Sequence, residues 1–134
     1  MIMTRTLFIL FVSSILASLA RAEGTGDFTG TWASKTTDAI TFALDLKQTG
    51  SRIEGYHNAV AQSGRRVDDV QPDSGKPSIS GSVRGRVAHV TFSSGYGDGT
   101  GEATITLNGN RLDWKITKSS GMHYLPSASV LHRQ

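Results

Sequence analysis

The side chains best suited to acid–base or nucleophilic chemistry are the four histidines, His57, His89, His123 and His132. They lack the spacing of a metal site, such as a pair four residues apart on a helix, so each is expected to be a surface or strand-face residue. Serines are numerous, but none lies in a Gly-x-Ser-x-Gly elbow. The chain has no cysteine, which excludes a thiolate zinc site and a cysteine nucleophile. The sequence therefore predicts no enzyme, no metal and no cofactor.

A dense charged segment lies in the middle of the chain, where Arg65 and Arg66 precede Asp68 and Asp69. These side chains could form an acid–base or anion site. Adjacent opposite charges on a polar loop more often form solvated salt bridges of little energetic weight, and this is the favoured interpretation.

A glycine-rich segment at residues 95–101 has the composition of a phosphate-binding loop. It lacks the GxGxxG order and no helix is predicted after it. A flexible hairpin loop is therefore expected there.

The clearest structural element is a β-hairpin at residues 101–117. Apolar residues occupy alternate positions on both sides of Asn108-Gly109-Asn110, for example Ile105, Leu107, Leu112 and Trp114. A period of two gives each strand one buried and one exposed face, and Asn and Gly tolerate the positive φ of a tight turn.

The same pattern predicts further strands at residues 27–34, 39–48, 52–58, 77–83, 86–93 and 127–133, with a polar loop at 59–76. No sustained period of 3.6 residues follows the N-terminal segment, so helix should be minor. The predicted fold is all-β, an eight-stranded antiparallel up-and-down meander closed into a small barrel, because closure hides the edge strands. An open sandwich is the alternative.

Residues 1–22 resemble a secretory signal peptide. Arg5 precedes an apolar run at residues 7–20, and Ala20-Arg21-Ala22 has the form of a cleavage site. The apolar run is shorter than the ~20 residues of a spanning helix, which disfavours a membrane anchor. We therefore expect an exported protein, periplasmic or extracellular and of bacterial source, with a single β-barrel domain at residues 23–134.

Charge argues against nucleic acid as a partner. The net charge of +3 includes Arg5 and Arg21, so residues 23–134 carry 12 basic and 11 acidic residues. A nearly neutral domain lacks the clustered cations that phosphate binding needs. Membrane insertion as an outer-membrane barrel is not expected either, because the outward faces carry charged residues such as Asp45, Lys47 and Glu102.

Connection lengths predict where a binding site would lie. Tight turns around Gly50, Gly85 and Gly109 alternate with long connections, and alternate connections of a meander fall at the same end. Long loops are often retained for binding, although neutral drift of loop length is the other explanation. The candidate binding residues at this end are Lys35, Arg65, Arg66, Tyr96, Asp98, His123 and Tyr124.

The segment Phe28-Thr29-Gly30-Thr31-Trp32 resembles the Gly-x-Trp first strand of the calycin superfamily, which includes lipocalins, fatty-acid-binding proteins and avidins. The resemblance implies that a basic residue of the last strand, here Arg133, packs over Trp32. It gives Gly30, Trp32, Trp114 and Arg133 structural roles, with Trp114 before Ile116-Thr117 as a second point of similarity to avidins. Ser34 stands where avidins usually have asparagine, so biotin binding is not implied.

The sequence is compatible with two functions. In the first, a non-enzymatic binding protein holds a small apolar or amphipathic ligand at its long-loop end, between Tyr96, Tyr124 and Trp32 or Trp114. In the second, the loops bind a protein in the cell envelope, as an inhibitor or immunity protein against a cell-wall enzyme or protease would do. An eight-stranded barrel can be filled by side chains or can hold one small ligand, so the interior discriminates between them.

Overall fold

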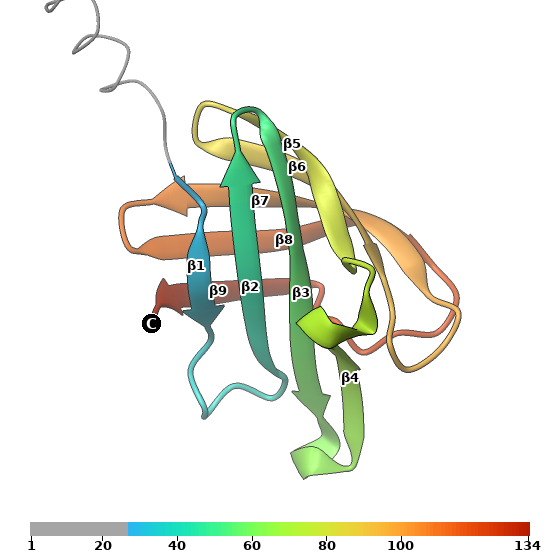
Figure 1. The fold of residues 1–134 in the computed structure, drawn as a ribbon. Coiled ribbons are helices and arrows are strands. Elements are labelled where there is room, and N and C mark those ends of the chain that lie inside the picture. The colour runs from blue at the N-terminus through green and yellow to red at the C-terminus, as the bar shows by residue number, and fades with distance from the viewer. Residues whose placement is uncertain (1–26) are drawn as a thin grey trace, which may run out of the picture.

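The computed structural model describes residues 27–134, and the predicted signal peptide at residues 1–22 lies outside the described residues. The chain is almost entirely β-structure (Figure 1), with two short 3-10 turns, η1 at Gln62–Gly64 and η2 at Pro72–Ser74. No helix in this part of the chain is long and apolar enough to cross a membrane. The strands are β1 Gly30–Ala33, β2 Thr41–Thr49, β3 Arg52–Ala61, β4 Arg66–Val70, β5 Ile79–Arg84, β6 Val87–Ser93, β7 Thr100–Asn108, β8 Arg111–Ser120 and β9 Ala128–Arg133.

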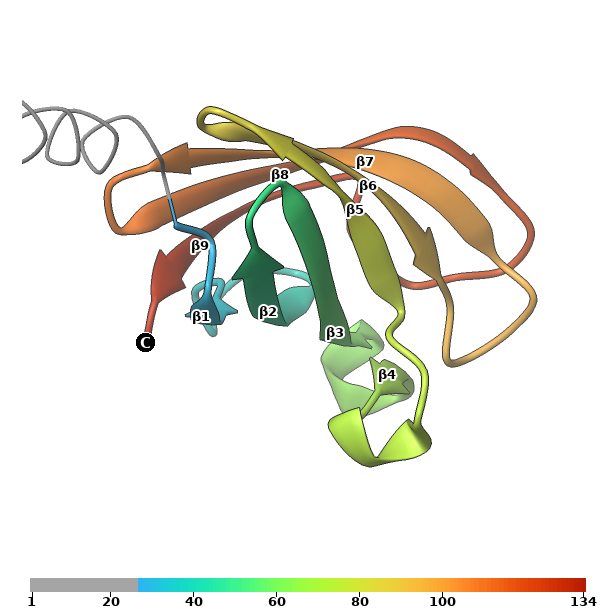
Figure 2. The ribbon, with the colours of Figure 1, turned by 45° about the horizontal axis from the view of Figure 1, so that its top comes forward.

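The strands form one antiparallel sheet that closes into a barrel. The order is β2-β1-β9-β8-β7-β6-β5-β3-β4, and pairing of β2 with β3 completes the circle. Figure 2 shows β7 and β8 arching over β1, β2 and β3. The predicted barrel is confirmed, and so is the antiparallel pairing of β1 with the last strand.

The prediction of a structureless polar loop at residues 59–76 is wrong in one respect, because it contains the strand β4. β3 pairs with β5 at Gly55↔Ile79 and with β4 at His57↔Val70, so β4 and β5 follow one another along β3. The sequence pattern did not predict β4, because its inward residue is the fully buried Asp68 while Val67 is 48% exposed. This polarity is the reverse of an ordinary strand.

Tight turns and long connections occupy opposite ends of the barrel, as predicted. Gly50, Gly85 and Gly109 make the tight turns with φ of 61°, 63° and 62°, a conformation that favours glycine. We call this the turn end. Because neighbouring strands run in opposite directions, the connections at residues 34–40, 62–65, 94–99 and 121–127 lie at the other end, which we call the long-loop end. The connection from β4 to β5, at residues 71–78, lies alongside the middle of β3.

The barrel interior is filled by one continuous apolar core. The buried ring of Trp114 packs against two other rings of this core, with the ring centroids of Phe42 and Phe92 at 5.0 and 6.0 Å. Its Nε1 donates to the carbonyl of Pro126 at 2.8 Å. Packing of this kind leaves little room for a ligand inside.

The turn end is closed by the contact that the calycin resemblance implied. The guanidinium of Arg133 lies 4.2 Å from the centroid of the buried Trp32 ring, and its Nη1 donates to the carbonyl of Thr29 at 2.7 Å. Gly30 has φ of 138°, and a Cβ there would lie 3.1 Å from Nη1 of Arg133. Glycine at position 30 therefore permits both the backbone conformation and the approach of the arginine.

Candidate functional site

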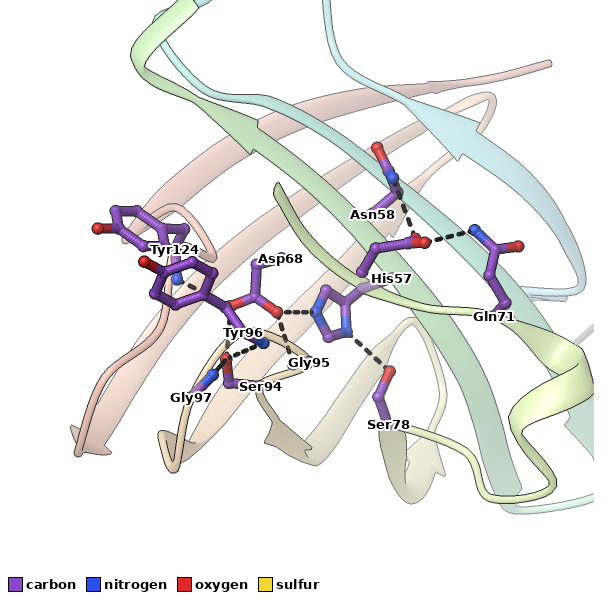
Figure 3. A network of polar contacts seen from close by, with 11 residues as sticks. His57, Asn58, Asp68, Gln71, Ser78, Ser94, Gly95, Tyr96, Gly97 and Tyr124 are labelled. Carbon is purple, nitrogen blue, oxygen red and sulfur yellow. Dashed lines mark hydrogen bonds and ion pairs between the residues drawn. The ribbon is translucent and has the colours of Figure 1, made fainter. Parts of the chain in front are cut away.

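Asp68 is the central side chain of the long-loop end (Figure 3). It is fully buried, and its carboxylate accepts four hydrogen bonds. Oδ1 accepts from Nε2 of His57 at 2.8 Å and from the backbone N–H of Gly95 at 2.7 Å. Oδ2 accepts from Oγ of Ser94 at 2.7 Å and from the backbone N–H of Tyr124 at 2.9 Å. One carboxylate thus joins β3, β4 and two long loops.

His57 extends this network toward β5. Its other ring nitrogen, Nδ1, lies 2.7 Å from Oγ of Ser78. An ionised carboxylate can only accept hydrogen bonds, so Nε2 of His57 carries the proton that faces Asp68. On its other side, the ring shares the hydrogen bond at Nδ1 with the Ser78 hydroxyl. We call Asp68, His57, Ser78 and Ser94 the Asp68 network.

The environment of Asp68 favours its charged form. Burial alone would raise the pKa of this carboxyl group, but the hydrogen bonds from His57, Tyr124, Ser94 and Gly95 outweigh burial and hold the pKa well below its ordinary value of 3.8. The carboxylate that ties the loops together is therefore ionised throughout the neutral range.

Acid should weaken the fold through this group. The folded-state pKa of Asp68 lies below 3.8, so its stabilising effect is complete above this pH and is lost as the pH falls further. Urea unfolding between about pH 6 and pH 2 should show a stability loss of up to about 1.4 kcal/mol per pH unit from this group. The difference in stability between wild type and Asp68→Asn separates the effect of Asp68 from that of Asp27. The pKa of Asp27 is also lowered, chiefly by the backbone N–H of Thr29. Equal slopes for the two proteins below pH 3.8 would contradict this assignment.

Hydrogen bonds fix the first of the two loops bound by Asp68 and also join it to the second. Oγ of Ser94 accepts from the backbone N–H groups of Tyr96 and Gly97 at 3.0 and 3.1 Å. Oδ1 of Asp98 accepts from the N–H of Met122 at 3.0 Å. The connections at residues 94–99 and 121–127 therefore form one structural unit, which we call the paired loops.

The paired loops present an aromatic and apolar surface. The rings of Tyr96 and Tyr124 meet edge to face with centroids 4.8 Å apart, and both are seen beside the Asp68 network in Figure 3. Tyr96 is 45% exposed and Met122 is 52% exposed. Large side chains that remain exposed on a fixed backbone are candidates for contact with a partner.

The structure brings four of the predicted binding residues together and separates three. Tyr96, Asp98, His123 and Tyr124 all belong to the paired loops, and the ring of His123 packs on Phe92 with centroids 5.2 Å apart. The other three lie elsewhere at the same end: Lys35 is in the β1–β2 connection, and Arg65 and Arg66 are in the β3–β4 hairpin.

One expectation from the sequence is confirmed and one is corrected. His57 lies on a strand face, as expected, and this is the inward face. Asp68 does not form a solvated salt bridge with the neighbouring arginines, because it points into the barrel and pairs with His57. Alternation along β3 was an available signal, since His57 falls in register with the inward residues Ile53 and Ala59.

The network contains the residue types of a serine hydrolase, Ser78, His57 and Asp68, in a hydrogen-bonded chain. A nucleophile must reach a carbonyl carbon of a substrate. Ser78 is only 5% exposed, and its hydroxyl is engaged with the buried imidazole. The geometry suits a role in fixing the loops. Within residues 27–134, no group of three His, Asp or Glu side chains is placed to hold a metal ion.

Comparison of the chain with protein-family models, curated proteins and solved structures gave no match.

Proposed function

We propose that this chain is an exported, non-enzymatic binding protein that engages a protein partner through the paired loops. The observation that carries the proposal is the exposed Tyr96, packed edge to face on Tyr124 and placed next to the loop that carries the exposed Met122. Tyrosine is enriched in binding hot spots because it offers a large contact area with few rotatable bonds.

Preorganisation of the loops supports this role. Asp68 and Ser94 together accept hydrogen bonds from the backbone of both paired loops, and Asp98 links one loop to the other. A loop that is already ordered loses less conformational entropy when it binds. Lys35, Arg65 and Arg66 would lie around this centre as the charged rim of an interface.

The filled interior favours a protein partner over a ligand held inside the barrel. The calycin-like classification, which stays a prediction, implies an internal ligand, but the rings of Phe42, Phe92 and Trp114 occupy the space it would need. A protein can instead use the outer surface of the loops. The partner class we favour is an enzyme of the cell envelope, with this chain as its inhibitor or immunity protein. A small apolar or amphipathic ligand lying against the tyrosine pair is the second candidate.

Removal of the two tyrosine rings should separate binding from stability. We expect Tyr96→Ala combined with Tyr124→Ala to lower affinity for the copurifying partner more than about tenfold, equivalent to about 1.4 kcal/mol. The melting temperature should change little, because both residues lie outside the apolar core. Native mass spectrometry of the protein purified from its own host would identify a retained protein or small ligand, and titration with that species would give the affinity.

The matched control is Arg84→Ala, which removes an exposed side chain at the turn end. It should leave binding unchanged. If Arg84→Ala abolishes binding while the tyrosine variant keeps it, the functional surface lies at the opposite end of the barrel.

A further inference from the structure

The seam between β1 and β9, which closes the barrel, is paired only at its end. β1 pairs with β9 at Trp32↔Arg133 and Ala33↔His132, whereas β8 pairs with β9 at every residue from Ala128 to His132. β1 ends here because Ser34 turns the chain toward β2: its N–H donates to the carbonyl of Phe42, and its Oγ accepts from the N–H of Phe42, both at 2.8 Å. In Figure 1 the connection after β1 swings away from β9.

The register shows which backbone groups of β9 face this gap. The carbonyl of Ser127 accepts from the N–H of Ile116, and the N–H of Arg133 donates to the carbonyl of Asn110. Because alternate residues of an antiparallel strand face the same neighbour, residues 127, 129, 131 and 133 face β8. Residues 128, 130 and 132 face the other way, and there Ala33 pairs only with His132. The N–H and C=O groups of Ala128 and Val130 therefore point into the gap.

The gap is a groove of about 990 Å³ on the outer wall of the barrel. Its lining comes from the connection that contains Lys35 and Ile40, from β9, and from the outward side chains of β8. Trp114 and Pro126 reach the groove but are buried, so Ile40 and Val130, which is 46% exposed, supply its apolar surface. We call it the β9 groove.

We propose that the β9 groove binds an extended peptide segment of another protein, which joins the barrel as a strand beside β9. Within residues 27–134, the N–H and C=O groups of Ala128 and Val130 have no backbone partner on this side. Their strand spacing matches the backbone of an extended chain, and main-chain hydrogen bonds supply the affinity in strand addition. Apart from Pro126 and Ser127 at the end of the second loop, this site uses residues outside the paired loops, and it binds through the backbone of β9, so it goes beyond the function proposed above.

The walls of the groove define the chemistry of the peptide. Side chains of the added strand that point inward would meet Ile40, and those that point outward would meet the charged side chains Lys35 and Asp38. The peptide class is therefore an extended segment in which apolar residues alternate with polar ones.

A second copy of this chain is a poor occupant. In each copy the free edge of β9 faces the wall formed by residues 35–40. Two recessed edges cannot approach to the ~4.8 Å spacing of paired strands. A free loop or tail of another protein has no such restriction.

The test uses a capped peptide in which valine and threonine alternate, with amide hydrogen exchange followed by NMR. In the free protein the amides of Ala128 and Val130 should exchange rapidly, and the peptide should slow their exchange at least about tenfold. Ser129 and Leu131, whose amides face β8, are the internal controls and should be protected in both states. The same peptide carrying N-methyl groups on the residues that face β9 should not bind.

Substitution at Val130 tests the same backbone group from the protein side. Val130→Pro removes an N–H that bonds no strand, a change that an edge position tolerates, and should lower peptide affinity by roughly tenfold. Val130→Thr keeps the N–H and should bind within about threefold of wild type. If the proline variant does not fold, the N-methylated peptide decides the question.

Three results would overturn the proposal. The first is protection of the Ala128 and Val130 amides in the free monomer, the second is equal binding of the N-methylated peptide, and the third is a dimer in sedimentation that protects these two amides.

Discussion

Replacement of Asp68 by asparagine is expected to lower the free energy of unfolding by about 2 to 6 kcal/mol, because each buried donor left without its acceptor costs about 1 to 3 kcal/mol. The amide is nearly the same size as the carboxylate, but it has one acceptor oxygen where Asp68 uses two. Of the four donors now bound, those facing the new NH2 group would lose their acceptor inside the barrel. Urea unfolding near pH 7 measures the change.

Asp69→Asn is the matched control, since it makes the same chemical change at the adjacent position. Asp69 is only half-buried, and its two oxygens accept from the side-chain amides of Asn58 and Gln71 at 3.0 and 2.7 Å. Its loss should cost less than about 1 kcal/mol. If the two variants are equally stable, Asp68 does not organise the long-loop end as argued.

The Asp68→Asn variant should also loosen the paired loops. Amide exchange at Gly95 and Tyr124 should accelerate, because their N–H groups bond directly to the carboxylate. Any partner that recognises the ordered loops should then bind more weakly. Stability and binding are thus linked through Asp68, whereas the tyrosine substitutions separate them.

Trp32→Ala is the second substitution with a large expected effect. Trp32 is fully buried, and its Nε1 donates to the carbonyl of Phe28 at 2.9 Å. Truncation removes the buried ring and leaves a cavity where β1 meets β9, so we expect a loss of about 3 to 5 kcal/mol in urea unfolding.

Arg133→Ala measures the contribution of the cation above the ring to stability separately from that of the ring itself. A cation–π contact contributes about 1 kcal/mol, and Arg133 also donates to the carbonyl of Thr29 and to Oδ1 of Asn110. Its loss should therefore cost clearly less than that of Trp32. An Arg133 variant as unstable as Trp32→Ala would show that closure of the barrel depends on the arginine and not on burial of the indole.

The sequence was sufficient for features that depend on neighbouring residues. Alternation of apolar and polar positions predicted β2 and β6–β8, and the glycine turns indicated which connections share an end. The segment from Gly30 to Trp32 also predicted the contact with Arg133, through its resemblance to the calycin first strand. The period of the strands and the conformation of the turns can be read from a single sequence because both are local properties of the chain.

Only the tertiary structure decided the sites. Asp68 accepts hydrogen bonds from a histidine 11 residues away and from a backbone amide 56 residues away. A local hydrophobic period cannot predict contacts between residues so far apart in the sequence. β4 could not be predicted for the same reason, since its buried position holds an aspartate whose partners come from other strands and loops. The β9 groove exists because β1 ends at Ala33 while β9 begins at Ala128. Its free backbone groups follow from the register of two strands almost a hundred residues apart, which closure of the barrel sets.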